Sequence, residues 1–194
     1  QMFYNCSTLT ILDLSNFNTS SVTNIKCSGQ TPSQGFDNSM FVGCNNLEYL
    51  NVSGWSNDKL TSLSGLFANL KSLKTIDLTN FNIGNSTNLS GMFYECNSLT
   101  NINLSSFNTE NVTNMYSMFR GCKSINNLDL SIFNTAKVTN MAYMFFGSPN
   151  LKTIQVSNLW NTDVVTSSSN MFYNCTNLVG GNCTTFNSSN VDKE

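Results

Sequence analysis

The chain contains no histidine among its 194 residues, and only 10% of its residues are charged. Without histidine it lacks the commonest general base and zinc ligand, and no C-x-x-C pair is present to bind zinc instead. No Gly-rich phosphate loop or nucleophile elbow occurs, and the few carboxylates are spread along the sequence. These absences argue against an enzyme, a metal site and a bound cofactor.

The scarcity of charge also limits the partners of the chain. The formal net charge is −2, with 9 Lys and Arg against 11 Asp and Glu, and no basic run occurs. A phosphate backbone needs a basic surface, so we expect no nucleic-acid partner. No apolar run approaches the roughly 18 residues of a membrane helix, so we expect no membrane span. Asn, Ser and Thr supply the polar surface instead.

What the sequence does contain is a repeat of about 26 residues. A Met-Phe or Leu-Phe pair recurs with its first residue at positions 2, 40, 66, 92, 118, 144 and 171. A fixed period of this length is typical of stacked repeat architectures. We therefore expect one continuous solenoid of about seven repeats over residues 1–179, with an insertion loop at 26–38 and a C-terminal cap at 180–194.

Each unit divides into a strand, a turn and a segment with helical spacing. The pattern L-x-x-L-x-L, which ends for example at Leu128 and Leu130, places alternate side chains on one face and predicts six parallel strands. An aromatic residue follows, and we expect it to stack on its equivalent one repeat away. Apolar residues then stand at i, i+3, i+4 and i+7, as at Met115, Met118, Phe119 and Cys122. The sequence thus predicts an α/β solenoid with a parallel sheet on one face and short helices on the other.

Two outward columns flank the inward leucine positions of the predicted strands. The first column alternates carboxylates with amides: Asp13, Asn51, Asp77, Asn103, Asp129 and Gln155. Such a column can form a polar ladder that satisfies its own hydrogen bonds. The second column varies more and includes Tyr49, Thr75, Asn101, Asn127 and Thr153. Variable positions on a regular framework also suit a ligand-binding face, with Tyr49 as an anchor, and both interpretations remain open.

Cysteine and threonine form further columns. One inward position that also accepts Leu70 and Ser148 holds most of the cysteines, which predicts buried free thiols at Cys6, Cys44, Cys96, Cys122 and Cys175. Cys27 and Cys183 lie outside this position, and Cys183 could form a disulfide with Cys175. An unbroken threonine column is explained either by helix capping or by a water-ordering surface of the ice-binding kind.

The unit L-x-x-L-D-L-S-x-F-N-T-x-x-V-T-N-M-x-x-M-F-x-x-C resembles the BspA-like leucine-rich repeat family of surface proteins. The resemblance covers essentially the whole chain. Residues 178–182 also look like the closing segment of this family, although Cys183 stands where a small residue is expected. The resemblance implies a curved leucine-rich repeat solenoid, exposure outside the cell, and roles in adhesion or host-protein binding. It supplies no catalytic motif.

The sequence patterns predict a non-catalytic module that binds through its strand face. The resemblance implies that it belongs to a cell-surface or secreted protein and that it binds a host or neighbouring-cell protein or glycan. The alternative is a structural spacer or stalk that displays other domains and binds nothing itself. The chain opens in the middle of a unit, so we expect a fragment of a longer exported protein. A repeat stack with an uncovered end exposes its core, so homotypic contact through the open N-terminal repeat is a further expectation.

Overall fold

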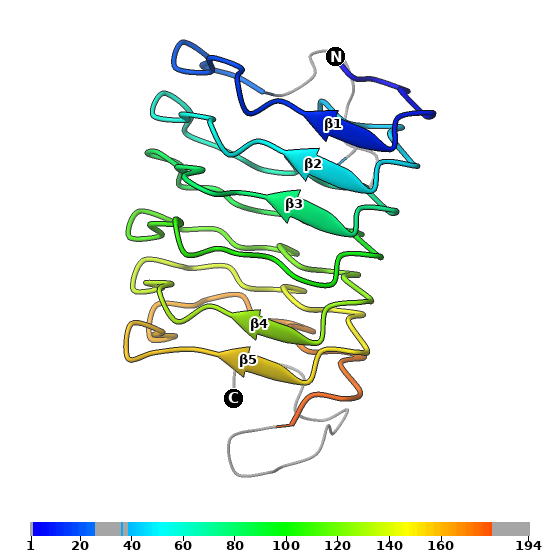
Figure 1. Cartoon of the computed structure of the whole chain (residues 1–194). Coiled ribbons are helices and arrows are strands. Elements are labelled where there is room, and N and C mark those ends of the chain that lie inside the picture. Colours follow the sequence, from blue (N-terminus) through cyan, green and yellow to red (C-terminus); the bar gives the residue numbers. More distant parts are fainter. Residues whose placement is uncertain (1, 26–35, 37–38, 180–194) are drawn as a thin grey trace.

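The computed structural model describes residues 2–25, 36 and 39–179. Within these residues the chain forms coils stacked one on another from the N-terminal end to the C-terminal end (Figure 1). Short strands of three residues lie side by side along one side of the stack. They are β1 (Ile11–Asp13), β2 (Tyr49–Asn51), β3 (Thr75–Asp77), β4 (Asn127–Asp129) and β5 (Thr153–Gln155).

The strands pair in parallel, in the register that the sequence repeat predicts. Leu50 is the register partner of Ile76 in the sheet β1-β2-β3, and Leu128 is the partner of Ile154 in the sheet β4-β5. The inward residues Leu50, Ile76 and Leu128 are buried, and Leu12 and Ile154 are half-buried, because side chains alternate between the two faces of a strand. Parallel pairing is therefore confirmed for five of the six predicted strands. The remaining predicted strand, at residues 101–103, does not form, and these residues lie unpaired between the two sheets.

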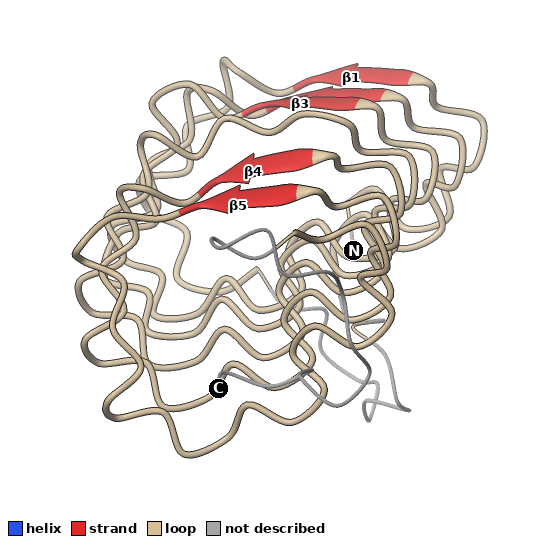
Figure 2. Ribbon diagram, turned by 90° about the horizontal axis from the view of Figure 1, so that it is seen from below, coloured by secondary structure: helices blue, strands red, loops and turns tan. Residues whose placement is uncertain are grey.

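The prediction of an α/β solenoid with short helices is wrong, because the described residues contain no helix. Away from the strands, each coil consists of loops and turns (Figure 2). Two positions four residues apart in the supposed helix are left-handed, as at Ser117 with a φ of 54° and Gly121 with a φ of 73°. A left-handed residue cannot continue a right-handed helix.

Hydrogen bonds in this segment also differ from those of a helix. The amide of Met118 donates to the Met115 carbonyl at 3.1 Å and closes a turn, whereas the amide of Phe119 donates to Met144 in the next coil at 2.8 Å. In a helix the Phe119 amide would donate to Met115. The turn that ends at Met118 has its positive φ at the third residue, as in a type II turn. Consecutive turns therefore produce the same i, i+3, i+4, i+7 burial that predicted a helix.

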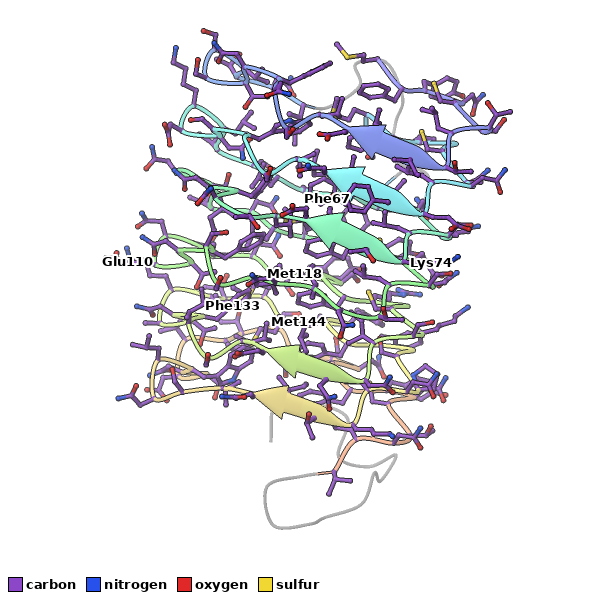
Figure 3. All side chains as sticks on the ribbon, in the orientation of Figure 1. Phe67, Lys74, Glu110, Met118, Phe133 and Met144 are labelled. Carbon is purple, nitrogen blue, oxygen red and sulfur yellow. The ribbon has the colours of Figure 1, made fainter. Side chains whose placement is uncertain are left out.

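Stacked aromatic rings form the centre of the molecule. One column runs from Phe3 to Phe172 with ring centroids 5.5 to 6.2 Å apart. The aromatic residues of the turns form a second column with centroids 5.9 to 6.5 Å apart. The predicted stacking is confirmed for Phe81, Phe107 and Phe133, whereas the Trp55 ring is tilted by 31° against Phe81. Burial of each ring contributes about 1.5–3 kcal/mol to stability. In Figure 3 the labelled Phe and Met side chains lie inside the stack, and Lys74 and Glu110 lie at opposite edges.

Asparagine and threonine side chains hold the turns and join the coils. The Asn114 Oδ1 accepts a hydrogen bond from the amide of Tyr116 at 2.9 Å, which is an Asx turn. The Thr113 hydroxyl donates to the Thr87 carbonyl of the preceding coil at 3.2 Å, and Thr139 bonds to Thr113 in the same way. Helix capping is therefore not the role of the threonine column, which instead links successive coils.

Candidate functional site

The predicted binding residues lie on the outward side of the strands and of residues 101–103. Most are exposed and three are half-buried, namely Tyr49, Asn51 and Asp77. The parallel register brings equivalent residues of adjacent coils together, so that Tyr49 lies beside Thr75 and Asn127 lies beside Thr153. The face is thus a surface of adjacent polar side chains over several coils.

The column of alternating carboxylates and amides is bonded mainly within each coil. One Oδ1 atom accepts a hydrogen bond from the backbone amide two residues later at 2.9 to 3.0 Å, as at Asp13, Asn51, Asp77, Asn103 and Asp129. Bonds from Ser15 lower the pKa of Asp13, to which Asn51 adds only a small contribution. The expected ladder between coils is therefore minor, and Asx turns explain why Asp or Asn occupies this column.

A depression opens in the strand face where the sheet pairing is interrupted. It has a volume of about 400 Å³ and spans β3, residues 101–103, β4 and β5. A second depression of about 250 Å³ adjoins it along residues 102–105. The larger one is lined by seven of the predicted binding residues, namely Thr75, Asn101, Asn103, Asn127, Asp129, Thr153 and Gln155. Asp13, Tyr49, Asn51 and Asp77 are not among its lining residues, so the predicted anchor Tyr49 lies outside it.

The backbone at this gap lacks the bonds that join the other coils. The amide of Thr75 donates to the Glu48 carbonyl at 3.2 Å, but the equivalent amide of Asn101 has no backbone partner among the described residues. The neighbouring bond from the Thr100 amide to the Lys74 carbonyl is stretched to 3.5 Å. Backbone groups without a protein partner remain free to bond to water or to a ligand.

The chemistry of the depression is neutral hydrogen bonding around an apolar floor. Ile102 is half-buried, whereas the equivalent Leu128 is only 2% exposed. The Thr153 hydroxyl donates to the Asn127 Oδ1 at 2.7 Å and fixes both side chains. Asp129 carries the only charge among the lining residues, and bonds from Ser131 lower its pKa. The lining therefore combines amide and hydroxyl groups, one carboxylate and a half-buried apolar side chain.

Two other kinds of site are absent from the described part of the chain. No group of three or more His, Cys, Asp or Glu residues there could hold a metal ion. No helix there is long and apolar enough to span a membrane.

Buried cysteines bond to the backbone of the preceding coil. The Cys122 thiol donates to the Phe93 carbonyl at 3.2 Å, and Cys44, Cys96 and Cys175 make equivalent bonds. The hydroxyl of Ser148 donates to the Phe119 carbonyl at 3.1 Å in the same position of its unit. This position therefore favours a small side chain that can donate, which links one coil to the one before it.

Burial makes these thiols weak acids. It raises the pKa of Cys96 to about 12 and that of Cys175 to about 11, so neither is a reactive thiolate at neutral pH. Cys175 is a free thiol in the structure. Cys183 lies outside the described residues, and its disulfide with Cys175 stays a prediction.

Sequence reasoning missed a column of aromatic residues that includes an arginine. Tyr94, Arg120, Phe146 and Tyr173 each follow the Phe of a Met-Phe pair. The Arg120 guanidinium carbon lies 4.6 Å from the Phe146 ring centroid and 5.6 Å from that of Tyr94. These residues were absorbed into the predicted helix. The sequence feature that could have identified them is the variation of this position from unit to unit, because the Met-Phe pair before it hardly changes.

The parallel register, the stacked coils and the exposed strand face define a repeat protein whose units contact their sequence neighbours. The chain belongs to the family described as Mycoplasma protein of unknown function, DUF285, which is the BspA-like repeat family. The family matches residues 1–127, 34–152 and 98–194, which together cover the chain. No curated protein matches the chain.

Proposed function

We propose that this chain is a non-catalytic binding module with BspA-like leucine-rich repeats, part of a cell-surface or secreted protein. It binds a protein or a glycan through the depression on the strand face. The observation that carries the proposal is the coincidence of the pairing gap at residues 101–103 with a recess of about 400 Å³. A volume of about 400 Å³ lies within the range of clefts that hold small ligands.

The groups around the recess indicate how a ligand is held. Neutral amides and hydroxyls, such as Asn101 and Thr153, would contribute about 0.5–1.5 kcal/mol for each hydrogen bond. Contact with Ile102 would remove apolar surface from water. Since Asp129 is the only charged lining residue, we expect an affinity that depends weakly on salt.

Glycan-array and surface-protein pull-down screens with the 194-residue chain would identify the ligand. The first variants are Asn101→Ala and Asn101→Lys, because this exposed side chain makes no hydrogen bond within the described residues. We expect at least about a tenfold loss of affinity from the lysine variant. Asn16→Ala is the matched control, an exposed asparagine away from the recess.

Two outcomes would contradict the proposal. A ligand whose affinity is the same for Asn101→Lys as for the unaltered chain binds elsewhere. The second outcome is that the chain binds no ligand in either screen and belongs to a longer protein with a separate binding domain. This result would support the alternative of a structural spacer.

We also propose homotypic contact through the first coil. Met2 is 66% exposed and Phe17 is 45% exposed, whereas Phe81 and Phe107, the equivalents of Phe17 in later coils, are buried, so the first coil presents uncovered apolar side chains. Sedimentation velocity should show association that rises with concentration and that falls in the variant Phe17→Ser. A monomer at all concentrations would exclude this contact.

A further inference from the structure

Arg120 is a cation enclosed by aromatic rings. Its guanidinium carbon lies 4.6 Å from the ring centroid of Phe146, 5.4 Å from that of Tyr143 and 5.6 Å from that of Tyr94. The Phe146 ring stacks in turn on Tyr173, with centroids 5.0 Å apart and an interplanar angle of 16°. The rings hold the planar guanidinium by cation–π contacts. A column of π faces with one charge in it therefore runs along several coils.

The charge in this column has no acidic partner among the residues that the structure describes. The only ion pair among the described residues joins Lys74 to Glu48, and the Arg120 Nε is buried without a hydrogen-bond partner. Glu95 belongs to the neighbouring coil, but its carboxylate lies against Gly121. A buried donor without a partner is costly, and the guanidinium fork matches the two oxygens of a carboxylate. Within the described part of the chain, the column thus holds no anionic acceptor for Arg120.

The rings beside Arg120 suit an acidic sugar better than they suit the phosphate backbone of a nucleic acid. Tyr173 is 46% exposed, and Tyr116 and Tyr143 are half-buried with ring centroids 5.8 Å apart. Tyrosine combines an apolar face with a polar rim, and a pyranose ring has the same combination of C–H face and hydroxyl edge. A single cation cannot neutralise a phosphate backbone. It matches one carboxylate on one sugar residue.

We propose that Arg120, Tyr94, Tyr143, Phe146 and Tyr173 form a second binding site, which takes the carboxylate of an acidic sugar in a glycan chain. The guanidinium binds the carboxylate, and the rings pack against the sugar. None of these residues lines the depression on the strand face. The second site is therefore independent of the function proposed above.

A matched pair of probes tests this site with the 194-residue chain. The probes are a galacturonic acid tetramer and its methyl ester, which differ in charge at the carboxyl groups, and calorimetry measures both affinities. We expect the acid to bind at least about tenfold more tightly than the ester, because a hydrogen bond to a charged group is roughly twice as strong as a neutral one. The affinity for the acid should fall as salt is added.

Variants assign the binding to the column. Arg120→Gln should remove the preference for the acid, and Arg120→Lys should restore only part of it, because lysine keeps the charge and loses the fork. Tyr173→Ala removes an exposed ring and should weaken the binding of both probes without disturbing the buried part of the column. Lys123→Gln is the control, since Lys123 is an exposed cation of the same unit outside the column. It should bind as the unaltered chain does.

Several outcomes would overturn the proposal. The first is that the acid and the ester bind with equal affinity, and the second is that neither probe binds. The third is that Arg120→Gln has a native circular dichroism spectrum and binds the acid as tightly as the unaltered chain does. Tetraglutamate that binds as tightly as the galacturonate would instead indicate a site for acidic proteins. Asn101→Lys should leave this binding intact. If that variant abolishes it, the sugar binds in the depression on the strand face and the second site does not exist.

Discussion

At Ser117 the backbone conformation and the side chain are both unfavourable. Its φ of 54° is left-handed, and its hydroxyl is buried without a hydrogen-bond partner. Gly65 and Gly91 occupy the equivalent position in the preceding units, with φ values of 67° and 58°. A left-handed conformation costs roughly 1–2 kcal/mol for a residue other than glycine, and an unsatisfied buried hydroxyl adds about 1–3 kcal/mol.

The variant Ser117→Gly should therefore raise the free energy of unfolding by about 1 kcal/mol or more. Urea unfolding followed by tryptophan fluorescence measures this change. Ser124→Gly is the control, because the Ser124 hydroxyl donates to the Asn97 carbonyl at 2.8 Å and its φ is not left-handed. The control should lower stability. A lower stability for Ser117→Gly as well would show that its side chain supports the native packing.

The buried thiols predict a loss of stability in alkali. The folded chain raises the pKa of Cys96 to about 12 and that of Cys175 to about 11, from an ordinary value of 9.0. The unfolded chain therefore loses these protons first. The contribution to stability is complete below about pH 9 and is lost as the pH rises through the folded pKa values.

Urea unfolding in the presence of reductant, at about pH 8 and about pH 10.5, tests this dependence. The double variant Cys96→Ser, Cys175→Ser keeps a donor of the kind seen at Ser148 and has no thiol to ionise at these positions. It should lose less stability between the two pH values than the unaltered chain. Equal losses would mean that other groups, such as lysine or tyrosine, cause the alkaline effect.

Among the elements, five strands could be predicted from sequence, whereas the turns that stand in place of the predicted helices could not. Inward residues such as Leu50 and Leu128 recur with the repeat period, and parallel neighbours in a stack must share that period. The helical spacing was ambiguous, because successive turns bury the same positions. The left-handed positions that distinguish the two are occupied by glycine at Gly121 and Gly147. They also hold Glu95 and Tyr143, which do not signal a left-handed turn in a sequence.

The position of the recess could not be predicted either. Asn101 and Asn103 flank Ile102, much as Asn127 and Asp129 flank Leu128 in β4. Asn and Asp both have low strand propensity, yet only residues 127–129 form a strand. The difference therefore depends on packing between coils, which a local pattern does not contain. Sequence did predict which residues face outward along the recess.

Hydrogen exchange can test the gap in the sheet directly. The Asn101 amide has no backbone partner, whereas the amides of Thr75 and Thr153 donate to the preceding coil at 3.2 and 3.3 Å. We expect Asn101 to exchange at least about tenfold faster than either threonine, because protection requires a hydrogen bond that must open. Equal protection of the three amides in a two-dimensional NMR measurement would show that the sheet is continuous in solution.

Over the whole chain, successive coils share one register, so we expect the chain to fold after the deletion of one complete coil. Phe93 stacks between Phe67 and Phe119, and equivalent residues occupy every layer. Deletion of residues 92–117, one full period, would place Thr75 beside Asn127 and bring the two sheets together. We expect a folded chain with a lower melting temperature and no helical signal in far-ultraviolet circular dichroism. The strand-face depression, and any binding that depends on it, should be lost.

A deletion out of register is the control for that experiment. Removal of residues 92–104, half a period, leaves half a coil without a strand, so this half-coil cannot align its columns with those of its neighbours. This variant should unfold or aggregate. If both deletions fold equally well, the register does not determine the packing of the coils.

The direction of the bonds between coils has a mechanical consequence. Amides such as Leu89 and Phe93 donate to the next coil, to Asn114 and Met118, at 2.9 Å, and these bonds run along the stack. Tension between the two ends would load the coil boundaries in series. Each coil that peels away frees the 26 residues from Tyr49 to its register partner Thr75, or their equivalent, which is roughly 90 Å of extended chain. A chain tethered at one end and bound at the other would lengthen in steps, and each step would relieve the force on its ligand.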